Sequence, residues 1–284
     1  MTTDYKLVFF GTPRFAVTIL AQLKAAGIVP ALIVTAPDKP AGRGLELKMP
    51  AVKEWAIENE VHCIQPENLR GDTSTAVGPE VSPLDILRNS EWDLFIVAAY
   101  GQILRKDILD LPSNGTLNVH PSLLPRFRGA SPIESQILAD EKEVGVSIML
   151  LDEQMDHGPV LAQARITLEE WPMRARDLEE LLATEGGDLL AECIPPFLAH
   201  TLQPEPQDHA AATFTKKITK ADGEVDLAAD GYQNYLKYCA YDEWPGTFFF
   251  KDDKRIKIVE AVFENGTFRP TRVIPEGKNE QDWK

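Results

Sequence analysis

The stretch "DLFIVAAYG", residues 93–101, is the strongest strand candidate in the sequence, and the segments around it decide the fold class. A short apolar run bounded by a turn signal is typical of a buried strand. Upstream, "KLVFF" (6–10) turns at "GTP" (11–13) into the helical pattern of residues 14–27. Further strands are predicted at 30–36 and 61–66, and helices at 51–60 and 83–90. Strands and helices that alternate at this spacing predict an open, Rossmann-like, mostly parallel α/β sheet.

Downstream of this stretch the alternation continues and then gives way to a different pattern. We predict a strand at 115–122, a helix from Pro132, a strand pair at 145–153 and 159–168, and a helix at 175–199. Residues 202–213 are proline-rich and polar, which is typical of a linker. We therefore predict a first domain over 1–201, a linker over 202–213, and a small β-rich domain over 214–284. Its end, "PEGKNEQDWK" (275–284), is expected to be poorly ordered.

Composition and charge exclude several classes of protein. The 284 residues carry a net charge of −15, which argues against a general nucleic-acid binder, because such proteins attract phosphates with basic surfaces. No apolar run approaches the ~18 residues of a membrane helix, and no signal peptide is evident, so we expect a cytoplasmic protein without a membrane. Cys63, Cys193 and Cys239 lie far apart and form neither a disulfide framework nor a zinc spacing. We therefore expect no structural metal.

Polar residues follow three of the predicted strands. Ligands of open α/β sheets bind outside the carboxyl ends of the strands, so "GTP" (11–13), "AYG" (99–101) and "NVHPS" (118–122) are expected on one rim. Strand alternation places the side chains of Asn118 and His120 on the same face. Pro121 and Pro125 come after these two residues and restrict the backbone of the next turn, as suits a pre-organised site.

Two further segments each have a structural and a functional interpretation. Asp156, in a tight turn before Gly158, is either an Asx-type turn residue or a carboxylate directed toward His120. The segment 36–50 is long for a connection and carries Lys39 and Arg43, so it is either a solvated loop or a basic finger for a phosphate-bearing partner. The turn at 11–13 lacks both the G-x-G-x-x-G and the phosphate-loop patterns, which argues against a dinucleotide or ATP site.

Five stretches taken together resemble the folate-dependent formyltransferase family: "FFGTPRFA", "APDKPAGRG", "VAAYGQIL", "NVHPSLLPRFRGASPI" and "MDHGPVL". The resemblance implies the formyltransferase fold and 10-formyltetrahydrofolate as the formyl donor. It also implies that a tetrahedral intermediate is stabilised by Asn118 and His120, with Asp156 as base or orienting group. The family's C-terminal OB-like β-barrel normally extends further, so we expect a shortened one in this chain.

The resemblance also assigns binding residues. The donor is expected along Tyr100, Gly101, Gln102, Ile103, Leu104, Ser122, Leu123, Leu124 and Pro125. The loop at 36–50 resembles that of members that formylate initiator methionyl-tRNA, and the implied substrate and tRNA contacts are Gly11, Thr12, Pro13, Phe15, Lys39, Gly42, Arg43 and Gly44. Basic residues of the second domain form either a basic strip for RNA or a solvated face: Lys216, Lys217, Lys220, Lys251, Lys254, Arg255 and Lys257.

Other functions stay open on the sequence. The same residues would serve a formyltransferase acting on a nucleotide-linked amino sugar, or a hydrolase of formyl-folate that uses water as the nucleophile. A non-catalytic folate- or RNA-binding protein that keeps the fold is the alternative from outside the enzymes. In each case we expect a monomer.

Overall fold

The computed structural model describes residues 5–41, 46–69 and 83–283, and these residues form two compact units. Unit 1 draws on Met1–Pro125, Gly145–Ala164 and Leu182–Ala212, and unit 2 on Arg126–Val144, Arg165–Leu181 and Thr213–Lys284. The chain therefore passes between the units several times. The predicted boundaries at 201 and 213 stay predictions.

Unit 1 is built on a seven-stranded sheet of order β10-β9-β7-β6-β1-β2-β5. Strands β1, β2, β5, β6 and β7 run parallel, whereas β9 is antiparallel to β7. The sheet strands are β1 (Leu7–Gly11), β2 (Leu32–Val34), β5 (Cys63–Ile64), β6 (Leu94–Ala98), β7 (Thr116–His120), β9 (Val144–Leu150) and β10 (Val160–Ile166). The predicted open, mostly parallel α/β sheet is confirmed.

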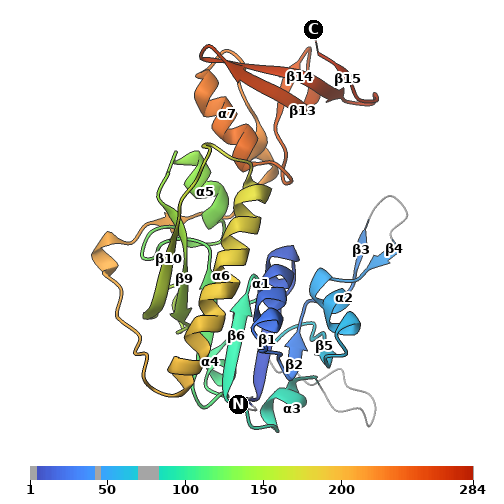
Figure 1. Cartoon of the computed structure of the whole chain (residues 1–284). Helices are drawn as coiled ribbons and strands as arrows, with labels where there is room; N and C mark the ends of the chain where they lie inside the picture. The colour runs from blue at the N-terminus through green and yellow to red at the C-terminus, as the bar shows by residue number, and fades with distance from the viewer. Residues whose placement is uncertain (1–4, 42–45, 70–82, 284) are drawn as a thin grey trace. The chain divides into compact units, whose positions relative to one another are not determined.

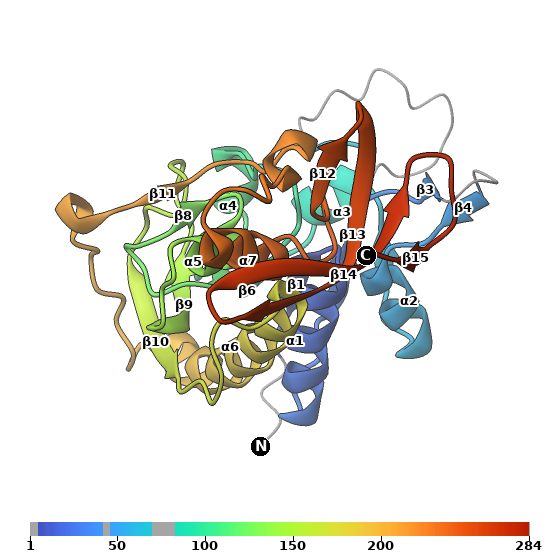
Figure 2. The ribbon, with the colours of Figure 1, turned by 90° about the horizontal axis from the view of Figure 1, so that it is seen from above.

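Helices cover both faces of this sheet, as Figures 1 and 2 show for α1 and α6 on one face and α3 and α4 on the other. The helices of the first half of the chain are α1 (Arg14–Ala25), α2 (Ala51–Glu58), α3 (Pro83–Arg88) and α4 (Lys106–Leu109), and the long α6 (Ala175–Leu198) follows later. Among the described residues, no helix is long and apolar enough to cross a membrane.

Strand alternation explains the two layers. Val8, Phe10 and Phe95 point to the face that packs on α3 and α4, where Leu87 and Ile108 are fully buried in the same cluster. On the opposite face, a pair of glycines in α6 permits close packing. A β-carbon on Gly186 would lie 2.7 Å from Val119, and one on Gly187 would lie 2.7 Å from Gln22 of α1. Strands buried on both faces read as continuous apolar runs, which is why the sequence predicted them well.

Unit 2 combines two helices with an antiparallel sheet. Its helix α5 (Pro132–Leu138) packs on α7 (Gly231–Ala240), and its four-stranded sheet has the order β12-β13-β14-β15. These strands are β12 (Phe248–Lys251), β13 (Lys254–Glu264), β14 (Thr267–Pro275) and β15 (Gln281–Asp282). The short parallel pair β8 (Arg128–Gly129) and β11 (Phe214–Thr215) and a 3₁₀ turn at Lys220–Gly223 also belong to unit 2, whereas a 3₁₀ turn at His209–Ala211 belongs to unit 1. The β-rich second domain is confirmed, and its strands β12 to β15 form an antiparallel meander.

Two expectations differ from the structure. The end of the chain was predicted to be poorly ordered, and this is wrong for the described residues up to 283. There β15 pairs with β14, and the Trp283 ring contacts that of Phe249 at 5.2 Å between centroids. The contacts of one partly buried aromatic side chain thus order a segment whose other residues are polar. Within the segment 36–50, the structure adds a two-stranded antiparallel hairpin of β3 (Lys39–Ala41) and β4 (Glu46–Lys48).

Candidate active site

The carboxyl ends of β1 and β6 meet at the centre of the sheet. Chain order changes direction there, because β2 lies on one side of β1 and β6 on the other, and such a switch point is where open α/β sheets bind ligands. The Thr12 hydroxyl donates a hydrogen bond of 3.0 Å to the Tyr100 carbonyl and joins the two strand ends. Gly11 has no room for a side chain, since a β-carbon would lie 2.6 Å from that of Ala16.

The turn after β6 has an unusual backbone. Ala99 and Gly101 both have left-handed φ values, +47° and +84°, and Tyr100 between them packs its ring edge against Phe10 at 5.5 Å. Burial raises the pKa of the Tyr100 phenol, so this side chain stays neutral. Ile103, by contrast, is 81% exposed. The turn thus anchors one side chain in the core and presents an apolar one to solvent.

Strand β7 carries Asn118 and His120. The two residues are two apart in an extended strand and therefore lie on one face, as predicted. His120 is buried at 4% exposure and pairs in register with Ser147 of β9, whereas Asn118 is partly buried beside Met149. The strand therefore delivers an amide and an imidazole at the edge where β7 ends.

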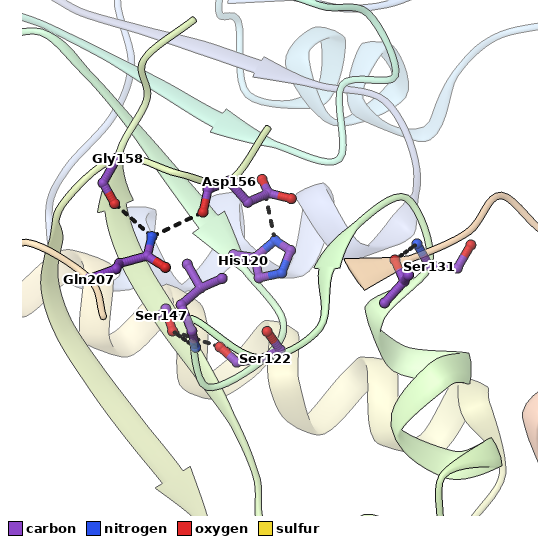
Figure 3. A network of polar contacts seen from close by, with 9 residues as sticks. His120, Ser122, Ser131, Ser147, Asp156, Gly158 and Gln207 are labelled. Atoms are coloured by element: carbon purple, nitrogen blue, oxygen red, sulfur yellow. Dashed lines mark hydrogen bonds and ion pairs between the residues drawn. The ribbon is translucent and has the colours of Figure 1, made fainter. Parts of the chain in front are cut away.

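Asp156 reaches His120 from the turn that joins β9 and β10, which we call the Asp156 turn (residues 151–159). Its Oδ1 lies 3.7 Å from Nδ1 of His120, and Figure 3 shows the carboxylate facing the ring. The two side chains are only 13% and 5% exposed. The separation exceeds a hydrogen bond but is short enough for an ion pair, so a small movement brings the two groups into proton-transfer distance. The φ of Asp156, +49°, is that of a turn residue, so both interpretations of this residue stay open.

The turn after β7, residues 122–125, is held by two side chains of the neighbouring strands. The Ser147 hydroxyl donates to the Ser122 carbonyl at 2.6 Å and accepts from the Leu124 amide at 3.0 Å (Figure 3). Gln163 of β10 donates to Ser147 Oγ at 2.7 Å and to the Leu124 carbonyl at 2.8 Å. We call this group the SLLP turn with its Ser147–Gln163 bracket. Within the turn, Ser122 and Leu124 are buried, while Leu123 and Pro125 are partly exposed.

The remaining predicted residues lie in varied surroundings. In the turn after β1, Thr12 is partly buried and Pro13 is exposed, whereas Phe15 is 4% exposed inside α1. Lys39 is exposed in β3, and Gly42, Arg43 and Gly44 lie outside the described residues. In the turn after β6, Gly101 is exposed, Gln102 is partly exposed and Leu104 is buried. Within residues 5–41, 46–69 and 83–283, no cluster of three or more His, Cys, Asp or Glu side chains is placed to hold a metal ion.

Sequence reasoning missed three residues around the site: Ser147, Gln163 and Gln207. Ser147 and Gln163 are polar residues within apolar strands, and that break in the pattern is a usable signal. Gln207 lies in the segment predicted as a linker, and its side chain donates to the backbone of the Asp156 turn. Nothing in the local sequence indicates that contact.

Comparison with known families gives two matches that together span most of the chain. The model named Formyl transferase matches residues 5–194, and the model named Formyl transferase, C-terminal domain, matches residues 217–280. The boundary between the two matches falls around the predicted linker.

Individual relatives agree with the family matches. The methionyl-tRNA formyltransferase of Chloroflexus aurantiacus is 41% identical over 275 residues, covering 95% of this chain and 84% of that protein. The enzyme of the same name from Myxococcus xanthus is 39% identical over 272 residues, covering 96% and 84%.

Solved structures share the fold at much lower identity. An N-formyltransferase from Helicobacter canadensis, in complex with folinic acid and dTDP-3-aminofucose, matches with a TM-score of 0.67 and 17% identity over 92% of this chain and 88% of that one. A methionyl-tRNA formyltransferase from Clostridium thermocellum matches with a TM-score of 0.59 and 16% identity over 99% of both chains. At such identities these likenesses concern the fold alone.

Proposed function

The chain belongs to the formyl transferase family of enzymes, and we propose that it transfers the formyl group of 10-formyltetrahydrofolate to the amino group of initiator methionyl-tRNA. Relatives at about 40% identity carry the name methionyl-tRNA formyltransferase, which favours this acceptor over an amino sugar. The observation that supports the chemical part of the proposal is the distance of 3.7 Å between His120 Nδ1 and Asp156 Oδ1. His120 lies on the same strand, β7, as Asn118.

The three side chains have complementary roles in this proposal. The formyl donor supplies an electrophilic carbon, and attack by an amine creates negative charge on oxygen and positive charge on nitrogen. Collapse of this tetrahedral intermediate breaks the bond between the formyl carbon and the donor nitrogen, which takes a proton and leaves as tetrahydrofolate. The Asn118 amide can donate to that oxygen without a change in its own protonation. Removal of one such donor typically costs about 10²- to 10³-fold in rate.

His120 and Asp156 form the proton-handling part of the site. In its protonated form the imidazole can donate a proton to the oxygen and become neutral, and the carboxylate can orient the ring through Nδ1 and accept the proton released by the amine. General acid–base help of this kind is typically worth about 10²- to 10⁴-fold. The two side chains are close and largely buried, so a proton can pass between them during the reaction.

The residues at the two turns fit a folate-sized donor. Ile103 presents an exposed apolar side chain after β6, and a flat heteroaromatic ring would cover it favourably. The SLLP turn is fixed by the Ser147–Gln163 bracket, so its backbone groups are available at defined positions. Such rigid placement suits hydrogen bonds to a polar ligand.

The acceptor side of the proposal relies on local basic groups in an acidic protein. Lys39 of unit 1 is exposed, and so are the seven basic residues of unit 2 named above. Because the protein is acidic overall and carries only a few exposed lysine and arginine side chains of this kind, we expect the partner to be bound through a few phosphate contacts rather than by a broad basic surface.

The decisive assay incubates the purified chain with 10-formyltetrahydrofolate and charged initiator tRNA and detects formylmethionine after deacylation. We expect formylation, and a KM for tRNA that rises steeply with salt as phosphate contacts are screened. Formylation of a nucleotide-linked amino sugar instead, or formate release without an acceptor, would replace the proposal with one of the alternatives. Binding of the donor without turnover on any amine would indicate a non-catalytic protein.

A further inference from the structure

The Asp156 turn requires support from outside itself. Asp156 has a left-handed φ of +49°, a conformation that side chains other than glycine rarely adopt. Its carboxylate lies 3.7 Å from His120, so a displacement of the turn by less than an ångström changes whether the two groups can share a proton. The position of this backbone is therefore a requirement of the proposed chemistry.

Gln207 supplies that support with a single amide group. Its Nε2 donates to the Asp156 carbonyl at 3.0 Å and to the Gly158 carbonyl at 2.7 Å, as Figure 3 shows. The residue is only 9% exposed. Both hydrogens of the amide are thus used on the carbonyl oxygens on either side of the His157–Gly158 peptide unit, in a site largely shielded from water.

Neighbouring residues attach the same segment to the Asp156 turn and to the strand that follows it. Glu205 and Val160 exchange two backbone hydrogen bonds of 2.8 Å, and the rings of His157 and His209 stack 4.0 Å apart at 3°. His157 is held in turn by Asp152, whose Oδ2 lies 2.7 Å from Nδ1. Residues 205–209, which we call the strap, therefore contact the turn and β10 at three successive points, and Gln207 lies in the middle.

We infer that Gln207 is a positioning residue for Asp156: it fixes the backbone from which the carboxylate reaches His120. The inference rests on the proposed function, because it concerns the proton pair of that reaction. It assigns a role in catalysis to a segment whose composition is that of a linker. Its contacts are with main-chain carbonyls of the turn, so it acts through Asp156 and not on the substrate.

The test compares Gln207→Ala and Gln207→Glu with a control, Gln203→Ala. Gln203 belongs to the same segment but is exposed, and its amide donates to the His200 carbonyl at 3.0 Å. Formylation rates are measured against the concentrations of donor and charged tRNA. We expect kcat to fall about 10- to 100-fold in Gln207→Ala, as for a misplacement of about 1 Å, with both KM values unchanged. Gln207→Glu, which presents oxygen to the two carbonyls, should be at least as slow, and the control should match wild type.

A second readout separates positioning from general loss of structure. Hydrogen exchange of the amides of residues 155–158 and 160 should quicken about tenfold in Gln207→Ala and not in the control, while amides of β1 and β6 keep their protection. Combined with Asp156→Asn, the Gln207→Ala change should slow turnover no further, because its effect passes through that carboxylate.

Three results would overturn the inference: a kcat of Gln207→Ala within twofold of wild type, a loss explained fully by a smaller folded fraction, or an undiminished further loss in the Asp156→Asn background. Failure of the proposed function has a different signature, since wild type itself would then not formylate methionyl-tRNA.

Discussion

Replacement of Ser147 by alanine should uncouple the SLLP turn from the sheet. The Ser147 hydroxyl is fully buried and uses its whole hydrogen-bonding capacity, with one bond donated to Ser122 and two accepted from Leu124 and Gln163. Gln163 keeps a partner without it, because the same amide nitrogen donates to the Leu124 carbonyl. In the variant, the Ser122 carbonyl and the Leu124 amide each lose their hydrogen bond to the Ser147 hydroxyl.

The expected magnitude follows from those two backbone groups. Removal of a hydrogen bond from a buried backbone group costs at most about 1–3 kcal/mol, so the free energy of unfolding should fall by up to about 2–6 kcal/mol. The turn is also part of the proposed donor site, and its backbone groups would no longer be fixed. We therefore expect the KM for 10-formyltetrahydrofolate to rise about tenfold or more, with a smaller change in the KM for tRNA.

Urea unfolding and steady-state kinetics measure both effects on the same samples. The matched control is Ser113→Ala, because the residue is exposed and its bonds to the carbonyls of Trp92 and Asp93 are long, 3.4 and 3.5 Å. The Asn114 amide that donates to the Ser113 hydroxyl at 3.1 Å also donates to the Asp93 carbonyl at 2.9 Å, so it keeps a partner in the control. The control should change stability by less than about 0.5 kcal/mol. A Ser147→Ala variant as stable as the control, with an unaltered donor KM, would refute the reasoning about the bracket.

Two further substitutions test other parts of the structure. Gly158→Ala should disrupt the Asp156 turn, since its β-carbon would lie 2.0 Å from the Leu150 carbonyl oxygen, and we expect about 1–3 kcal/mol of destabilisation and a fall in kcat. The control Gly277→Ala has open space but a left-handed φ of +73°, so it should cost some stability and leave kcat unchanged. Comparable formylation by both variants would contradict the crowding argument. Trp283→Ala should lower the stability of unit 2 by about 1–2 kcal/mol, because the ring packs on Phe249 and under the Lys251 ammonium. Thermal unfolding measures the loss, and Lys278→Ala, at an exposed site, is the control. Equal melting temperatures for these two variants would mean that the end of the chain adds nothing to the fold.

The sequence predicted those features that arise from local pattern. Buried parallel strands such as β1 and β6 are short apolar runs between turn signals, and alternation along β7 places Asn118 and His120 together. The rule that ligands of open α/β sheets bind outside the carboxyl ends of the strands then predicted at which edge of the sheet the site lies.

What the sequence did not reveal depends on contacts between distant residues. Gln207 lies 51 positions from Asp156 along the chain, and its polar, proline-rich neighbours resemble any exposed connection. Trp283 lies in a run of charged residues, and its packing on Phe249 requires the whole meander to form first. In both cases the local structure depends on the contacts of one side chain, whereas the composition of a segment reflects all of its residues.

The central claim is that Asn118, His120 and Asp156 act as one site for formyl transfer. The most direct measurement is the rate of formylmethionyl-tRNA formation by Asn118→Ala, His120→Ala and Asp156→Asn, each verified as folded, and by the triple variant. We predict that each single change lowers kcat/KM by about 10²-fold or more, and that the triple variant is little slower than the slowest single one, because residues that act as a unit are not additive. Wild-type rates in any of the three single variants would contradict the account.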